Sequence, residues 1–288
     1  MNIAVLMTCF NRVEKTLNCL NSLEQQKYIE SIELDVYLVD DGSSDGTSEA
    51  VCNKFPNVKL ISGNGNLYWN GGMRLAWKKA IDSGINYDGF LWLNDDVTLL
   101  DDAVSRIVTS LTNLRLSGIK VGAICGQMVN DKGTPTYGGW LDRGKDRLKP
   151  KMLQVDDKFN QLSDTINGNF VLVSREGYEE IGNLCEVYTH QMGDFDYGYR
   201  LTEKGFLNFQ LKGVAGYCSS NSKIGTFRDI SLDFKTRLKL LNRPNQIAPV
   251  DEWKYFVKKH SRKNVNVRMA KLYFRKYAPS IWLILFGR

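Results

Sequence analysis

The first 120 residues alternate short apolar runs with segments whose apolar residues recur at helical spacing, and this alternation constrains the fold most. We expect buried strands at 2–7, 33–39, 58–61 and 89–93, then at 121–129 and 169–174. Helices are expected over roughly 12–26, 71–83 and 101–116, with another beginning near Gly193. Strands that alternate with helices of this length predict an α/β fold: a Rossmann-like, mostly parallel sheet covered by helices.

Polar clusters directly follow three of the expected strands. They are Thr8–Arg12, Asp40–Asp45 and Asn94–Asp96. Parallel strands bring their carboxyl ends to one edge of a sheet, and ligands bind at that edge. The sequence therefore predicts one binding site to which all three clusters contribute.

The last of these clusters interrupts the apolar run "LWLNDDVTLL" (91–100) with one amide and two carboxylates. Burying an unpaired carboxylate costs on the order of several kcal/mol, so a partner is required. Hard divalent cations bind carboxylate oxygens and share them with substrate phosphates, which favours a site for a cation and a diphosphate. The alternative is a strand end that caps the next helix, although Asp101 and Asp102 suit that role better.

Two further segments leave alternatives open. Asp40 and Asp41 either bind ribose hydroxyls or form a tight turn and helix cap. The loop "GNGNLYWNGGMR" (63–74) carries Asn70 and Arg74 into a helix start, where anions bind well; the alternative is a flexible connector. It is not a dinucleotide-binding loop, because it follows the third strand and lacks the final spaced glycine.

The segment "HQMGDFDYGYR" (190–200) places two carboxylates among aromatic residues at a helix start. A carboxylate in a partly apolar pocket has a raised pKa and can act as a general base, which we expect for Asp194. For Asp196 we expect an ion pair with Arg200 one helical turn later. His190, one of only two histidines, is either a metal ligand or a satisfied polar contact.

Charge is unevenly distributed along the chain. Of the net charge of +6, residues 231–288 carry +11, from 14 Lys and Arg against 3 Asp and Glu, so the rest carries −5. We predict a main domain over 1–225 and a basic, aromatic-rich helical extension over 226–288. Basic and aromatic side chains together favour contact with an anionic membrane, while the alternative is a solvated helix packed on the domain. An acidic main domain argues against nucleic-acid binding.

The cysteines and the apolar runs predict a cytoplasmic location. The six cysteines are scattered without a C-x-x-C pair, which favours reduced thiols and argues against zinc. The N-terminal run has no signal-peptide pattern, and no apolar stretch approaches the ~20 residues that span a bilayer. We therefore expect a cytoplasmic protein, with peripheral contact to the inner face of the cell membrane.

Four motifs together resemble those of the inverting family 2 glycosyltransferases, which have the GT-A fold. They are "TCFNR", "VDDGSSDGT", "WLNDDV" and "GDFDYGYR", in that order within residues 1–220. The resemblance implies transfer of a hexose or deoxyhexose from a UDP- or dTDP-sugar to a hydroxyl of a saccharide or lipid-linked saccharide, in bacterial cell-surface polysaccharide synthesis. It also implies Mn²⁺ or Mg²⁺ as a cofactor.

The resemblance also implies roles for single residues. Asp194 matches the general base, Asp96 matches the metal ligand, and Asn94 stands where the first acid of a D-x-D signature often is. The residues expected to contact the nucleotide are Thr8, Asn11, Arg12, Asp40, Asp41, Asn70, Arg74, Asn94 and Asp95. "YGGW" (137–140) and "NGNFVLVSR" (167–175) are similar to segments that border the acceptor and the donor sugar.

Two departures from the family pattern concern the acceptor and the metal. An expected Glu-Asp pair reads Gly193-Asp194, and "YCSSNS" (217–222) lacks the histidine that binds metal in many members. Either the metal has fewer protein ligands, or His190 is a substitute ligand. Two rival functions are a sugar nucleotidyltransferase and a binding module without turnover. The first needs a glycine-rich first loop that "TCFNR" does not provide, and the intact Asp96 and Asp194 argue against the second.

Overall fold

The computed structural model describes residues 1–28, 30–142, 148, 150–220, 223–241, 243–246 and 249–286. The first part of the chain forms β1 (Asn2–Cys9), α1 (Val13–Glu24), β2 (Glu33–Asp40), α2 (Thr47–Lys54), β3 (Lys59–Ser62), α3 (Tyr68–Asp82), β4 (Gly89–Leu93), β5 (Thr98–Leu99) and α4 (Ala103–Leu116). The middle part forms β6 (Val121–Val129), β7 (Pro135–Tyr137), β8 (Gly139–Leu141), β9 (Lys151–Met152), β10 (Gln161–Ser163), β11 (Thr165–Ile166), β12 (Phe170–Ser174), α5 (Arg175–Ile181), α6 (Gly193–Glu203) and β13 (Leu207–Tyr217). The last part is helical, with α7 (Phe234–Leu241), α8 (Val250–His260), α9 (Val265–Tyr277) and α10 (Pro279–Phe286).

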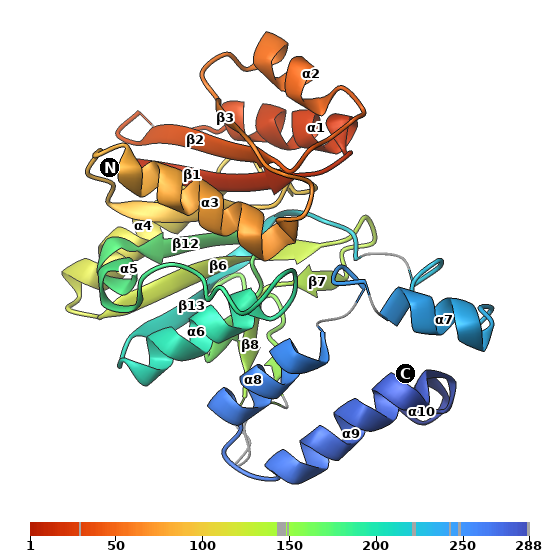
Figure 1. Ribbon diagram of the computed structural model, residues 1–288. Helices are drawn as coiled ribbons and strands as arrows, with labels where there is room; N and C mark the ends of the chain where they lie inside the picture. The colour runs from red at the N-terminus through yellow and green to blue at the C-terminus, as the bar shows by residue number, and fades with distance from the viewer. Residues whose placement is uncertain are drawn as a thin grey trace.

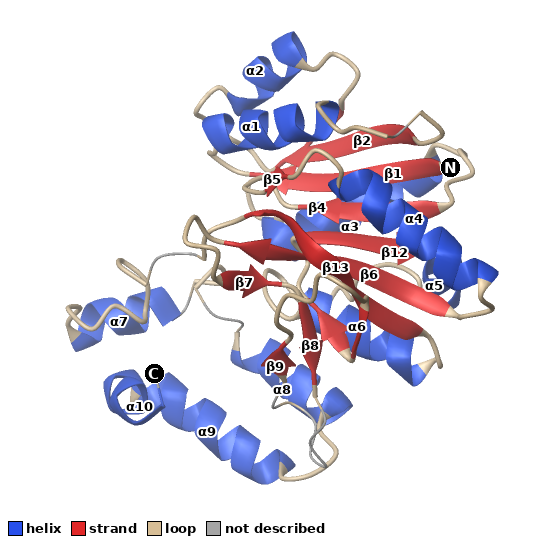
Figure 2. Cartoon of the chain, turned by 180° about the vertical axis from the view of Figure 1, so that it is seen from behind, coloured by secondary structure: helices blue, strands red, loops and turns tan. Residues whose placement is uncertain are grey.

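One large sheet organises the molecule, with strand order β10-β13-β6-β12-β4-β1-β2-β3 (Figures 1 and 2). The strands β4, β1, β2 and β3 pair in parallel, as do β6 and β13. Between these two parallel groups, β12 pairs antiparallel with both β4 and β6. A small second sheet, β11-β8-β9, lies beside α6. The predicted α/β fold with a mostly parallel sheet is confirmed.

The core lies on both faces of the large sheet because its central strands are apolar on both faces. In β1, Ile3 and Val5 pack with residues of α1, α2 and α4, whereas Ala4 and Leu6 pack with residues of α3 and α6. Successive side chains of a strand point to opposite faces, so such a run is buried only when helices cover both sides. This arrangement leaves the carboxyl ends of β1, β2 and β4 free to form a site.

The four C-terminal helices lie below and to the right of the sheet in Figure 1, and α8 is the one beside α6. Helix α8 packs on α6, where Phe256 and His260 contact Tyr199. Helix α9 packs on α8, and α10 packs on α9 and α7. In the described residues, no helix is both long and apolar enough to cross a membrane. Contacts therefore cross the boundary predicted at residue 225, and a separate extension over 226–288 stays a prediction.

The expected elements agree closely with the structure through α4. Strands predicted at 89–93 and 121–129 are β4 and β6 with the same bounds, and the helix predicted near Gly193 is α6. Strand β1 runs to Cys9, so Thr8 lies at a strand end rather than in the loop that follows. Strands β5 and β13, helix α5 and the short strands β7–β11 were not predicted, and no bounds were predicted for α2.

Candidate active site

Two adjoining cavities lie at the carboxyl ends of β1, β2 and β4. One has a volume of about 450 Å³ and is lined by Thr8, Arg12, Asp41 and Asp95, among others. The other, of about 620 Å³, also contains Arg12 and Asp95 and continues to Asp194. We call them the nucleoside cavity and the transfer cavity, after the roles proposed for them below. The prediction that all three polar clusters gather at one sheet edge is confirmed.

Arg12 is the partner that the buried carboxylates of "NDD" require. Its Nη1 lies 3.1 Å from Asp95 Oδ1 and 3.1 Å from Asp96 Oδ2, so one guanidinium bridges two adjacent acids. Burial raises the pKa of Asp95 to about 6, although Arg12 opposes the shift. The polar loop after β1 therefore supplies the positive charge that the end of β4 needs.

The two carboxylates fit a divalent cation that also takes ligands from a substrate. Asp95 Oδ2 is buried without a hydrogen-bond partner among the described residues, and Asp96 Oδ1 lies 3.6 Å from Cys218 Sγ. Within the described ranges, no three His, Cys, Asp or Glu side chains form a group that could hold a metal ion. A cation here would thus depend on phosphate oxygens or water besides the carboxylates, as Mg²⁺ usually does.

His190 does not join Asp95 and Asp96 in such a three-residue group. Its Nδ1 accepts a hydrogen bond from the Trp69 amide at 3.4 Å, and burial together with Arg12 lowers its pKa to about 4. His190 lines both cavities as a neutral side chain at neutral pH. Of the segment 217–222, where a late histidine was sought, residues 221–222 lie outside the described residues.

Asp41 lines the nucleoside cavity and anchors the loop on its far side. Its Oδ1 accepts from the Gly65 amide at 2.9 Å, and its Oδ2 accepts from the amides of Leu67 and Tyr68 at 2.8 and 2.9 Å. Three amide donors satisfy this buried carboxylate without a cation. These three hydrogen bonds could not be predicted from the sequence, because they join Asp41 to residues 24 to 27 positions away.

Asp40 and Asn11 instead build the turn beside that cavity. Asp40 accepts from the Ser43 amide at 2.8 Å and from the Ser48 hydroxyl, and Asn11 Oδ1 accepts from the Ser44 amide at 2.7 Å. Neither residue is among the described residues that line the two cavities. These bonds favour the turn alternative for Asp40 over direct contact with ribose.

Asn94 positions an aromatic wall of the transfer cavity. Its Oδ1 accepts from Trp69 Nε1 at 2.7 Å, and the indole lies so close to Gly168 that a Cβ there would overlap the ring. Gly168 is therefore required by the close approach of Trp69. All three residues line the transfer cavity, and Trp69, which the sequence analysis did not select, lines both.

Asn70 and Arg74 lie outside both cavities, contrary to the contact with nucleotide expected of them. Asn70 is fully buried, and its Nδ2 donates to the carbonyls of Cys185 and Tyr188 at 2.9 and 2.7 Å. Arg74 Nη2 lies 3.3 Å from Glu186 Oε2. Both side chains thus hold helix α3 to the loop that leads into α6.

Gly193 allows Asn70 to hold that loop. A Cβ at Gly193 would overlap the Asn70 Oδ1, so the departure from the family's Glu-Asp pair has a steric cause. A glutamate at position 193 would displace Asn70, and it would also displace Asp194, the next residue in the chain.

Asp194 lies in the first turn of α6, at the floor of the transfer cavity. Its Oδ2 accepts from the Gly168 amide at 3.0 Å, and its Oδ1 accepts from the Phe195 amide at 2.8 Å. Burial raises its pKa, and these amides oppose the shift only in part. Beside it, Phe195 packs 5.6 Å from Trp140, whose indole N–H donates to Asn167 Oδ1 at 2.5 Å. The arrangement is a buried carboxylate with a raised pKa beside aromatic faces.

Asp196 has the opposite environment two residues further along. It is fully buried, and Arg200 Nε, Lys259 Nζ and His260 Nε2 each lie 2.8 Å from one of its oxygens. Although burial alone would raise its pKa, these partners lower it to about 2. The predicted pair with Arg200 is confirmed, and the two contacts to α8 are additional.

The chain after β13 returns to the site, which the sequence analysis did not anticipate. Arg243 and Asn245 line the nucleoside cavity, and Lys223, Arg228 and Asn245 line the transfer cavity. The available signal was the basic character of the C-terminal region, for which the sequence favoured a membrane surface and left a solvated, packed helix as the alternative. The structure brings part of that charge to the edge where a diphosphate would lie.

The fold and the site define an α/β protein with a nucleotide-sized cavity, a cluster of two acids and an arginine, and an isolated acid beside aromatic residues. Residues 4–182 match the model of the family described as Glycosyl transferase family 2, and the chain belongs to that family. Its fold is GT-A, as the sequence resemblance implied.

The chain is also similar to solved structures. One is the mannosyltransferase PcManGT from Pyrobaculum calidifontis in complex with GDP-Man and Mn²⁺, at 14% identity and a TM-score of 0.58, over 98% of this chain and 72% of that one. Another is TarS 1–349 from S. aureus in complex with UDP-GlcNAc, at 12% identity and a TM-score of 0.58, over 100% of this chain and 76% of that one. No curated protein matches the sequence. At these identities the likeness establishes the fold.

Proposed function

We propose that this family 2 glycosyltransferase is an inverting enzyme with Asp194 as its general base. The observation that carries the proposal is one continuous transfer cavity that contains both Asp194 and the Arg12–Asp95–Asp96 cluster. At about 620 Å³ it lies within the range of small-molecule sites. The cavity therefore has room for a donor sugar between the acids and an acceptor hydroxyl near Asp194.

Asp194 would act as follows. It accepts the proton of the acceptor hydroxyl while that oxygen attacks the anomeric carbon from the face opposite the diphosphate. The bond from the anomeric carbon to the diphosphate oxygen breaks and its electron pair leaves with the diphosphate, so a single displacement inverts the configuration. One base suffices for this step, and the raised pKa of Asp194 brings it closer to working pH. Trp140 and Phe195 offer flat apolar faces for the acceptor sugar.

The nucleoside cavity would take the donor's base and ribose against Thr8 and Asp41, with the diphosphate between Arg12 and Arg243. Arginine forms strong charge-assisted bonds to phosphate oxygens. The similar structures bind GDP-Man and UDP-GlcNAc, which supports a nucleotide-sugar donor. For this chain we propose a UDP- or dTDP-sugar that delivers a hexose or deoxyhexose.

Asp96 and Asp95 would hold Mn²⁺ or Mg²⁺ together with the diphosphate. Bound there, the cation would neutralise charge on the departing nucleotide diphosphate. The unpartnered Asp95 Oδ2 and the Mn²⁺ in the PcManGT complex support this assignment. His190 would be a ligand of the cation only if substrate binding brought it nearer to Asp95 and Asp96.

The test is Asp194→Asn in the full chain, assayed with a panel of UDP-, dTDP- and GDP-sugars and saccharide acceptors. Loss of a positioned base typically lowers the rate by about 10²–10⁴-fold, and donor affinity should stay within a few-fold. In the wild type, transfer should fall on acidification at a pH above the ordinary range of an aspartate, because burial raises the pKa of Asp194. Asp131→Asn, at an exposed loop position, is the matched control.

Wild-type rates in the Asp194→Asn variant would refute its role as base. A product with retained anomeric configuration would refute inversion. Donor binding by the wild type without release of nucleotide diphosphate, with any acceptor, would instead favour a binding module. Formation of a nucleotide sugar from a nucleoside triphosphate and a sugar phosphate would favour the nucleotidyltransferase.

For the acceptor we propose a saccharide or lipid-linked saccharide of a cell-surface polysaccharide, reached from the cytoplasmic face of a membrane. Helix α10 supports this, because Ile281, Ile284 and Leu285 are 54%, 77% and 59% exposed beside a basic region. Exposed apolar and basic side chains together bind anionic lipid surfaces. The protein should sediment with vesicles that contain phosphatidylglycerol and less with phosphatidylcholine alone; equal sedimentation would contradict the proposal.

A further inference from the structure

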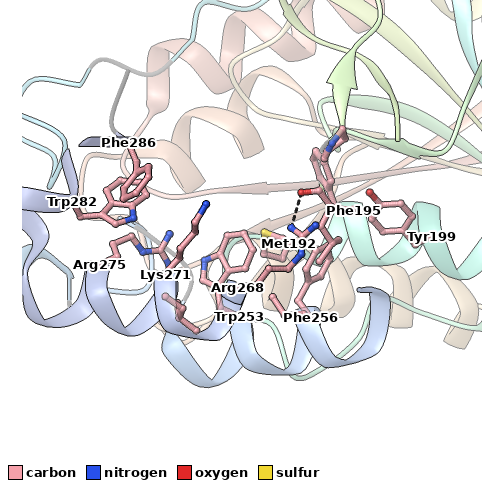
Figure 3. A pocket seen from close by; sticks show the side chains of 14 residues that line it. Met192, Phe195, Tyr199, Trp253, Phe256, Arg268, Lys271, Arg275, Trp282 and Phe286 are labelled. Atoms are coloured by element: carbon pink, nitrogen blue, oxygen red, sulfur yellow. Dashed lines mark hydrogen bonds between the residues drawn. The ribbon is translucent and has the colours of Figure 1, made fainter. Parts of the chain in front are cut away.

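A third cavity, of about 500 Å³, lies beside the transfer cavity and is enclosed by α6, α8, α9 and α10. Figure 3 shows Trp253 and Phe256 of α8 on its floor and Trp282 and Phe286 of α10 at one end. Met192 and Phe195, which flank Asp194 in the sequence, line both this cavity and the transfer cavity. A ligand in the third cavity would therefore lie next to the proposed base.

The lining combines apolar walls with cations and contains no acid. Besides aromatic and aliphatic side chains, it includes Arg268, Lys271 and Arg275 from α9, and no Asp or Glu is among its described lining residues. Arg268 Nη1 donates to the Leu148 carbonyl at 3.0 Å, which fixes it at the wall. A purely apolar ligand would leave the charges of Lys271 and Arg275 unmatched, and a free anion would leave the aromatic walls in contact with water. The lining matches an amphiphile with an anionic head.

Arg275 marks the place of that anion. Its guanidinium lies 5.3 Å from the Trp253 ring and 5.6 Å from the Trp282 ring, and no carboxylate of the described chain forms an ion pair with it. Burial and, to a smaller extent, the nearby Arg228 lower the pKa of Arg275 to about 10. Arg228 lines the transfer cavity and is close enough to Arg275 to affect its pKa, so the positive charge of the third cavity lies near the transfer cavity.

The indole N–H of Trp253 adds an unused donor to the same wall. It is buried and has no hydrogen-bond partner among the described residues. Buried donors are rarely left unpaired, so an acceptor oxygen is expected there. A phosphate group provides oxygens for this N–H and negative charge for the two arginines.

We propose that this cavity binds the lipid phosphate of a lipid-linked acceptor, with the hydrocarbon chain against Trp282 and Phe286 and the phosphate at Arg275. This assignment rests on the proposed function for its role, because it places a sugar carried on the phosphate beside Asp194. It narrows the acceptor class from any saccharide to one attached to a lipid through a phosphate. The exposed apolar side chains of α10 lie on the helix that closes the cavity, which gives a long chain a path towards a membrane.

The test uses farnesyl phosphate below its micellar concentration as the probe, with farnesol and inorganic phosphate as separate arms, and measures binding by calorimetry with the full chain. The wild type should bind farnesyl phosphate at least tenfold more tightly than either control ligand. Arg275→Gln and Trp282→Ala should each weaken this binding at least tenfold. Arg262→Gln, an exposed position between α8 and α9, is the matched control and should bind as the wild type does. Lys271→Gln removes a more exposed cation of the wall and should weaken binding even if the other variants unfold.

Equal affinity for farnesol would show an apolar site, and equal affinity for inorganic phosphate would show an anion site; either result would overturn the proposal. The proposal would also be overturned if Lys271→Gln and a folded Arg275→Gln both bound farnesyl phosphate as tightly as the wild type. If the wild type transfers sugar to a soluble saccharide but does not bind farnesyl phosphate, this inference is wrong while the proposed function stands. If farnesyl phosphate binds as described but no donor is turned over, the proposed function is wrong and the cavity assignment stands.

Discussion

Replacing Asp196 with Asn should destabilise the protein by about 3 kcal/mol and loosen the C-terminal helices. Asp196 is fully buried in α6, and its two oxygens are shared among Arg200 of the same helix and Lys259 and His260 of α8. The carboxylate is thus the charge that joins α8 to the helix carrying Asp194. An amide of the same shape removes that charge and leaves the cations in place.

The structure gives the magnitude in two ways. The partners lower the pKa of Asp196 from 3.8 to about 2, which corresponds to about 2 kcal/mol of stability at 1.36 kcal/mol per unit. Because the folded pKa is the lower one, this stability is present above pH ~4 and is lost as the pH falls towards 2. Removing one partner of a buried ion pair costs about 3–5 kcal/mol. Arg200 keeps bonds to the carbonyls of Ile181 and Asn183, so the lower end of that range applies.

The measurement is urea unfolding at pH 7, combined with hydrogen exchange of α8. We expect the variant to lose about 3 kcal/mol and α8 to lose protection, with the difference from the wild type shrinking near pH 2–3. The matched control is Asp251→Asn on α8, whose partner Lys254 lies one turn away and whose side chain is 92% exposed; it should stay within about 0.5 kcal/mol. A loss below about 1 kcal/mol, or unchanged protection of α8, would refute the reasoning.

Two further predictions concern the site. Asp95→Asn should stabilise the fold by on the order of 2–3 kcal/mol at pH 7 while weakening donor binding, because burial raises the pKa of Asp95 to about 6, above its unfolded value. That cost is absent below pH ~4, grows as the pH rises from about 4 to about 6 and is constant above that, so the gain in thermal stability should vanish at pH 4; a lower melting temperature at pH 7 would contradict it. Trp69→Phe should lower kcat/KM about tenfold, since it leaves Asn94 Oδ1 without its donor and frees the aromatic wall to move. Steady-state kinetics measures this, and unchanged kcat/KM would show that the bond is dispensable.

The fold up to β6 could be predicted because its signals are local. Apolar runs such as 89–93 and 121–129 are buried on both faces, so their lengths equal the lengths of the strands. Polar residues that directly follow such runs have to lie at the sheet edge. The positions of Arg12, Asp41 and Asp95 followed from that rule without any knowledge of their partners.

Strand β13 could not be predicted, because its buried side chains include polar ones. Asn208 and Gln210 are fully buried, and their amides bond to the carbonyls of Gly198 and Gln154. In the sequence these residues look like a solvated segment, since amides are usually exposed. Asn70 was misassigned for the related reason that its partners, Cys185 and Tyr188, lie more than a hundred residues away.

Helix α6 shows how one short segment gives two neighbouring acids opposite environments. Asp194 and Asp196 are two residues apart, so they point about 200° apart around the helix. One faces the transfer cavity with amide donors and no ion pair among the described residues, and burial raises its pKa. The other faces α8, and its contacts with His260, Arg200 and Lys259 lower its pKa to about 2. The contacts that hold the C-terminal helices therefore act on the helix that carries the proposed base, and those same helices enclose the proposed acceptor cavity. A change that frees α8 should consequently disturb acceptor binding and the placement of Asp194 together.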